Sequence, residues 1–165
     1  MASDARAIRS AAETLHSPNR RDITIILSRG IFAAAATLLL SASAFAATTT
    51  VNVMLMGEGG GPMKIELDKT AIPGGDVVFN VANHAMTEQH EVILVKLSSP
   101  DQVIPLNVKK HRVDESQLKT FGEVADLQPS DTGTLKAQQK SGTYLLFCNI
   151  KGHYEAGMAG KLTVN

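Results

Sequence analysis

The chain has 165 residues, a usual length for a single domain. Its 16 Lys and Arg residues balance its 16 Asp and Glu residues, so the composition gives no indication of binding to nucleic acid or another polyanion. It has one cysteine, Cys148, which excludes an internal disulfide.

The first 46 residues have the pattern of a secretory signal peptide. A polar, Arg-rich stretch is followed by Arg29, an apolar run and a small-x-small site that ends at Ala46. We therefore expect 1–46 to be a signal peptide and 47–165 to be one exported, periplasmic domain.

Arg20 and Arg21, followed by a polar residue, resemble a twin-arginine signal. The alternative to cleavage is a membrane anchor. The apolar run has about the minimum length for a membrane span and is diluted by Ala and Ser, so we favour cleavage.

From residue 47 onward, short runs with alternating or continuous apolar residues predict β-strands, separated by Gly- and Pro-containing turns. These runs are 51–56, 63–67, 77–83, 90–97, 142–149 and 160–165. The stretch 113–127 differs, since its apolar residues recur every three to five positions and Asp114 could cap a helix. The sequence predicts an all-β fold, a Greek-key β-sandwich or barrel, with a short helical or irregular insertion.

The stretch "FCNIKGHYEAGMAG" places Cys148, His153 and Met158 at five-residue intervals between the last two predicted strands. His90 begins an earlier, strongly apolar strand. Two imidazoles, one thiolate and a weak thioether suit a copper ion that cycles between Cu(I) and Cu(II). Taken singly, each residue could be an ordinary core or loop residue. A structural zinc site would need four Cys or His ligands, so the methionine favours copper.

The segments "FNVANHAMTEQHEVILV" and "GTYLLFCNIKGHYEAGMAGKLTV" resemble the cupredoxins, the small blue-copper proteins, and in particular their plastocyanin-, auracyanin- and sulfocyanin-like members. The resemblance implies that His90 and His153 are imidazole ligands, Cys148 the thiolate ligand and Met158 the axial ligand of one copper ion. It also implies that Asn149 lies just outside the ligands, with a backbone N–H near the cysteine sulfur.

Two features depart from the family pattern. Many relatives have an asparagine after the first histidine ligand, and its side chain braces the cysteine loop. This chain has Glu91 there, which puts the brace in doubt. The stretch 98–122 has no clear counterpart and is interpreted as an insertion.

The resulting hypothesis is an exported electron carrier with a cupredoxin-like copper-binding domain, and not an enzyme. We expect a monomer that docks weakly and briefly with redox proteins near His153. The alternative is a periplasmic copper chaperone or resistance protein that uses the same ligands to deliver or sequester copper. A copper oxidase or nitrite reductase would need a second copper centre, for which too few histidines remain.

Other residues compete with this ligand set. His84 is a rival to His90, but we expect it in a loop. His111 belongs to the basic stretch "KKHR", which indicates a solvated patch. We interpret Met54, Met56 and Met63 as core strand residues, the alternative being a second, soft Cu(I) site.

Overall fold

The computed structural model describes residues 47–165. The predicted signal peptide, its cleavage site and the twin-arginine pair lie outside the described residues. Among residues 47–165, no helix is long and apolar enough to cross a membrane. In chain order the elements are β1 (Thr49–Met56), β2 (Lys64–Leu67), β3 (Ala71–Ile72), β4 (Gly75–Asn83), β5 (His90–Lys96), β6 (Leu106–Asn107), β7 (Arg112–Val113), the 3₁₀-helix η1 (Glu115–Gln117), β8 (Thr120–Leu127), β9 (Thr132–Gln139), β10 (Gly142–Phe147) and β11 (Ala159–Val164).

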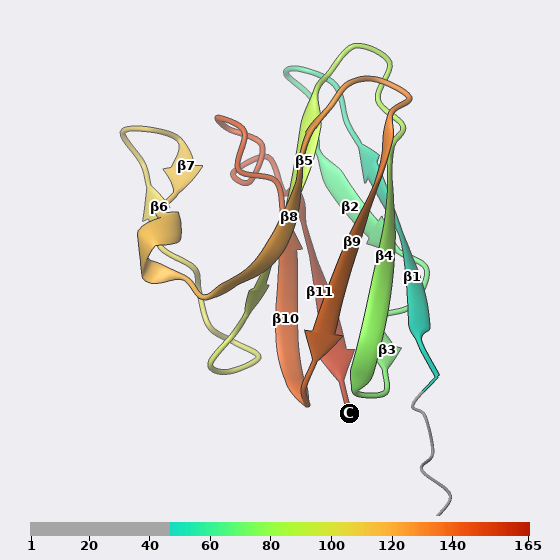
Figure 1. The fold of residues 1–165 in the computed structure, drawn as a ribbon. Helices are drawn as coiled ribbons and strands as arrows, with labels where there is room; N and C mark the ends of the chain where they lie inside the picture. Colours follow the sequence, from blue (N-terminus) through green and yellow to red (C-terminus); the bar gives the residue numbers. More distant parts are fainter. Residues whose placement is uncertain (1–46) are drawn as a thin grey trace, which may run out of the picture. The chain divides into compact units, whose positions relative to one another are not determined.

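All strands except β6 and β7, which pair only with each other, form two sheets that pack face to face (Figure 1). One sheet has the order β2-β1-β4-β9 and the other has the order β3-β11-β10-β5-β8. Most neighbours are antiparallel, but β1 pairs with β4 and β3 pairs with β11 in parallel. The predicted all-β sandwich is therefore confirmed.

The core between the sheets follows from the alternation of apolar residues along the strands. On β1, Val51, Val53 and Leu55 are at most 1% exposed, whereas Asn52 between them faces solvent. On β4, Val77, Phe79 and Val81 are buried in the same way. Period-two alternation thus gives each strand of this sheet one face toward the core.

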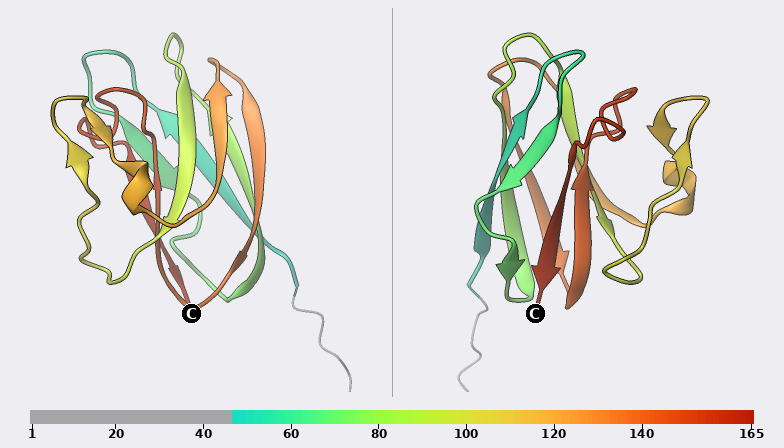
Figure 2. Two further views of the ribbon diagram at one scale, coloured as in Figure 1. Left: turned by 60° about the vertical axis from the view of Figure 1, so that its left-hand side comes forward. Right: turned by 180° about the vertical axis from the view of Figure 1, so that it is seen from behind.

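Strands β5 and β10 are instead apolar on both faces. One face lies in the core, and the other is covered by the connection between β5 and β8, residues 98–119, which we call the insertion (Figures 1 and 2). It contains β6, β7 and η1. The buried residues of this second apolar cluster are Ile93, Val95, Leu97, Ile104, Val113, Leu145 and Phe147.

The stretch 113–127 is only partly as predicted. Asp114 does cap a short helix, η1, by accepting a hydrogen bond from the Ser116 amide. The second half of the stretch, however, is strand β8. Gly122 and Asp126 have φ values of 132° and 56°, so the strand bends and its side chains do not alternate regularly. This is why its sequence pattern did not predict a strand.

Three loops gather at the end of the sandwich opposite the C-terminus: β1–β2, β4–β5 and β10–β11 (Figure 1). The first two are joined by the Glu58 carboxylate, which accepts hydrogen bonds from the amide of Met86 and from Thr87. Asn83 ties the β4–β5 loop to β8 by donating to the carbonyl groups of Glu88 and Leu127, each at 2.9 Å. These bonds fix the loops around the site described next.

Candidate metal centre

Two of the predicted ligands are brought together by strand pairing. His90 is the first residue of β5, and Cys148 directly follows the last residue of β10. The two strands are antiparallel neighbours, with Phe147 opposite Ile93. The start of one strand therefore lies beside the end of the other.

His153 completes the group from the β10–β11 loop. Its Nδ1 atom lies 3.2 Å from Nδ1 of His90 and 3.4 Å from Sγ of Cys148. The three donor atoms all lie within 4.8 Å of one another. His90 and Cys148 are fully buried, and His153 is 7% exposed. Among the described residues, this is the group of side chains with metal-ligand spacing.

The tautomer of His90 follows from its other nitrogen. Nε2 lies 3.2 Å from the carbonyl oxygen of Gly57. A carbonyl can only accept, so Nε2 carries the proton and Nδ1 keeps a free lone pair. That lone pair faces the centre of the group, as a metal ligand requires.

Met158 is held next to this group by backbone hydrogen bonds. Its amide donates to the carbonyl of His153 at 3.0 Å, and its carbonyl accepts from the amide of Cys148 at 3.1 Å. Gly157 precedes it with a φ of 97°, a conformation that favours glycine. The Met158 side chain is completely buried.

Burial sets the charge of the group. It lowers the pKa of His90 and of His153 below the ordinary imidazole value, and the neighbouring imidazole lowers that of His153 further. It raises the pKa of the Cys148 thiol to about 11, although the backbone N–H groups of Ile150 and Glu91 act in the opposite direction. Without a metal, the site therefore holds two neutral imidazoles and a protonated thiol at neutral pH.

Glu91 braces the cysteine loop, contrary to the doubt raised by the sequence. Its carboxylate accepts a hydrogen bond from the Asn149 amide at 2.9 Å. Glu91 is half-buried, and burial raises the pKa of its carboxyl group. The backbone N–H of Asn149 is thus directed to Glu91.

The insertion supplies the contacts that the sequence could not predict. Its hairpin, β6–β7, lies beside the β10–β11 loop and bonds to Asn149. Nothing in the spacing of residues indicated this pairing, because the partners are 36 positions apart.

The competing residues lie elsewhere. His84 is exposed and is not part of the ligand group. His111 is also exposed, as expected for a residue of a solvated patch, and its Nδ1 lies 2.7 Å from the carboxylate of Glu155. Met63 belongs to the core, but Met54 and Met56 are half-buried on the other face of β1, so the prediction of core positions is wrong for these two.

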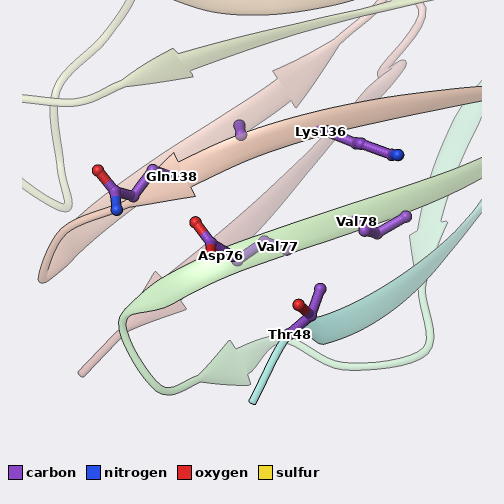
Figure 3. Close-up of a pocket in the computed structure, with 7 residues that line it drawn as sticks. Thr48, Asp76, Val77, Val78, Lys136 and Gln138 are labelled. Carbon is purple, nitrogen blue, oxygen red and sulfur yellow. The ribbon is translucent and has the colours of Figure 1, made fainter. Parts of the chain in front are cut away.

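A hollow on the four-stranded sheet is lined by residues of β4 and β9 and by Thr48 (Figure 3). Its lining on β4, Asp76 to Val78, is at the start of the strand, whereas the metal-ligand group lies beyond the strand's other end. This hollow is therefore separate from the metal centre.

The donor set fits copper. One thiolate sulfur and two imidazole nitrogens, with a methionine close by, are the ligands of blue-copper electron-transfer sites. A closed zinc site would need a fourth Cys or His, and neither occurs in the group.

A search of curated protein sequences gave no match. Among solved structures, the chain is similar to reduced auracyanin from the photosynthetic bacterium Roseiflexus castenholzii, with 21% identity, a TM-score of 0.51, and coverage of 73% of this chain and 99% of that one. It is also similar to rusticyanin from Thiobacillus ferrooxidans, with 22% identity, a TM-score of 0.53, and coverage of 72% and 77%. At these identities the structures show the shared fold.

The sequence itself matches a family model. The model describes copper binding proteins of the plastocyanin/azurin family, and it matches residues 51–165. This match covers well over half of the chain and includes every residue of the metal centre. The chain therefore belongs to the plastocyanin/azurin family of copper-binding proteins, and copper is its cofactor.

Proposed function

We propose that the chain is an exported blue-copper protein that carries single electrons between redox partners. In this proposal His90, Cys148 and His153 coordinate one copper ion, and Met158 is the weak axial ligand. The observation that carries the proposal is the buried group of two Nδ1 atoms and one Sγ atom, which lie within 4.8 Å of one another.

A preformed site suits electron transfer for a physical reason. The interior around it is closely packed, and the loop that holds three of the four residues is fixed by backbone bonds at both His153 and Met158. The ligands then have little freedom to move when the copper changes its charge. The proposal therefore assigns no substrate and no enzymatic reaction to the chain.

Partners are expected to dock where an electron leaves most easily. His153 is the only one of the three clustered ligands with measurable exposure. A shallow hollow of about 400 Å³ lies over it, lined by Gly59, Gly60, Gly61, Met63, Lys151, Gly152 and Ala156. Docking here would be weak and brief, as electron-transfer encounters are, and would leave the protein a monomer.

Export rests on the N-terminal pattern discussed above, with 1–46 as the signal peptide and 47–165 as the periplasmic domain. The alternative role in copper delivery would use the same ligands. It is not favoured, because the ligands are buried and Met54 and Met56 lie on a different face of β1. Copper delivery requires a metal that leaves readily.

The test is a visible absorption spectrum of the mature protein with Cu(II). We expect an intense thiolate-to-copper band that disappears on reduction, and its complete loss in Cys148→Ser. His84→Gln is the matched control, since it removes an exposed histidine and should leave the band unchanged. A weak or absent band, with Cu(I) still tightly bound, would contradict the electron carrier and support copper delivery.

A further inference from the structure

Asn149, the residue after Cys148, has all its side-chain polar atoms bonded to the insertion. Its Oδ1 accepts a hydrogen bond from the Val113 amide at 2.6 Å. Its Nδ2 donates to the Val113 carbonyl at 3.1 Å and to the Glu115 carboxylate at 2.6 Å. The side chain therefore pairs with β7 as a neighbouring strand would.

The main chain of Asn149 is held as firmly. Its carbonyl accepts a hydrogen bond from the guanidinium of Arg112 at 2.9 Å, and its amide donates to Glu91. Asn149 is only 4% exposed. Because it is covalently bonded to Cys148, its position constrains where the Cys148 backbone can go.

The insertion holds the copper loop at a second point. The carbonyl of His111 accepts a hydrogen bond from the Gly152 amide at 2.8 Å, directly before His153 in the chain. The side chain of His111 also bonds to Glu155, just after His153. The loop is thus gripped on both sides of the histidine ligand.

The hairpin that makes these bonds is itself anchored. Val113 and Ile104 are 4% and 2% exposed and belong to the apolar cluster on the outer face of β5 and β10. Phe147, next to Cys148, lies in the same cluster. Tyr154 of the copper loop packs edge to face with Phe147, and the centroids of the two rings are 5.8 Å apart. A packed cluster transmits restraint, because its side chains have no free volume into which to move.

We propose that the insertion is a clamp on the copper loop, and that Asn149 is the positioning residue through which it acts on Cys148. Residues just outside a metal's ligands typically change its affinity by 10- to 100-fold when they are replaced. Without the clamp, the residues that would hold the copper would be free to adapt to Cu(II), and the affinity for Cu(I) would fall more than that for Cu(II). The inference rests on the copper site proposed above.

The first experiment needs no copper, and its deciding measurement is made on the wild-type protein. It measures amide hydrogen exchange in the wild-type protein without metal, at Val113 and Gly152, which donate the bonds between the insertion and the loop. We expect both amides to be protected, and Asn149→Ala to speed exchange at Val113 at least tenfold. Exchange of both wild-type amides at the rate of exposed amides would overturn the clamp, even if the variant fails to fold.

The second experiment uses the copper-loaded protein. Asn149→Ala is compared with Ser116→Ala, which is also uncharged and in the insertion but removes a bond to Asp114 at 2.7 Å. We expect Asn149→Ala to release Cu(II) to EDTA roughly 10- to 100-fold faster, with a weaker visible band. Its reduction potential should fall, by about 59 mV for each tenfold loss of Cu(I) relative to Cu(II) affinity.

The outcomes separate the two proposals. If the release rate, band and potential of Asn149→Ala equal those of Ser116→Ala, Asn149 has no positioning role and the inference is wrong. If the wild-type protein has no thiolate-to-copper band at all, the proposed function fails, and protection of Val113 and Gly152 still decides whether the insertion holds the loop.

Discussion

Copper binding should release one proton at neutral pH, and that proton should come from Cys148. Burial raises the pKa of this thiol to about 11, so at pH 7.5 almost every molecule without metal carries the proton. Copper binds the thiolate form of cysteine and not the thiol, so the proton must leave when copper binds. The histidines add none, because burial lowers the pKa of both below about 6.5.

The size of the effect on copper affinity follows from the raised pKa of Cys148. At pH 7.5 the thiolate is roughly 3 × 10⁻⁴ of the protein, against about 3% for a thiol at the ordinary pKa of 9.0. The raised pKa of the thiol therefore weakens the apparent copper affinity about a hundredfold at this pH. Each rise of one pH unit should strengthen it about tenfold, up to the thiol pKa.

The assay counts protons with a pH indicator in weakly buffered solution under argon, as one equivalent of Cu(II) is added to the protein. We expect one proton for the wild-type chain at pH 7.5, none for Cys148→Ser, and a rising count only below about pH 6.5, where the ordinary imidazole titrates. Release of no proton from the wild-type protein would mean that the thiolate already exists without metal. Two or three protons at pH 7.5 would mean charged histidines. Either result would refute the reasoning from burial.

Three substitutions test the packing of the scaffold through the urea midpoint of the protein without metal. Gln139 is 1% exposed, and its side-chain N and O atoms have no hydrogen-bond partner within residues 47–165. Gln139→Met should therefore raise the free energy of unfolding by about 1 kcal/mol. A lower urea midpoint would reveal a polar partner. The Tyr144 hydroxyl accepts a hydrogen bond from the amide of Lys140 and donates one to its carbonyl. Tyr144→Phe should therefore lower the free energy of unfolding by about 1–2 kcal/mol. An unchanged urea midpoint would show that solvent replaces the hydroxyl. A Cβ on Gly133 would lie 2.3 Å from Cγ1 of Val124, so Gly133→Ala should cost about 1–3 kcal/mol unless β8 can move away.

The grouping of His90, Cys148 and His153 could be predicted because its signal is local. Cys148, His153 and Met158 lie on one loop, and the apolar run after His90 marks the start of a strand. The strands with regular alternation could be predicted for the same reason. Strand β9, which has few apolar residues, and β8, which bends, carry no such signal, and only their place in the sheets makes them strands.

The contacts around the ligands could not be predicted, because they depend on distance in space. Glu91 and Asn149 are 58 positions apart, and from the sequence alone it was in doubt whether the glutamate would brace the cysteine loop. A carboxylate oxygen is in fact a good acceptor for a backbone amide. The sequence shows that Glu91 departs from the usual asparagine. It does not show the geometry that lets the Glu91 carboxylate accept the bond from the Asn149 amide.

One signal for the insertion was nevertheless present in the sequence. Antiparallel neighbours such as β5 and β8 can be joined by a turn of about two to five residues, yet here the connection is the whole segment 97–119. The outer faces of β5 and β10 carry Val95, Leu145 and Phe147, which would lie in water if nothing covered them. Continuous apolar runs in an otherwise alternating sandwich therefore imply a covering segment, and the long connection between β5 and β8 is what covers them. This covering segment also bonds to Asn149, the residue after Cys148, and so reaches the metal centre.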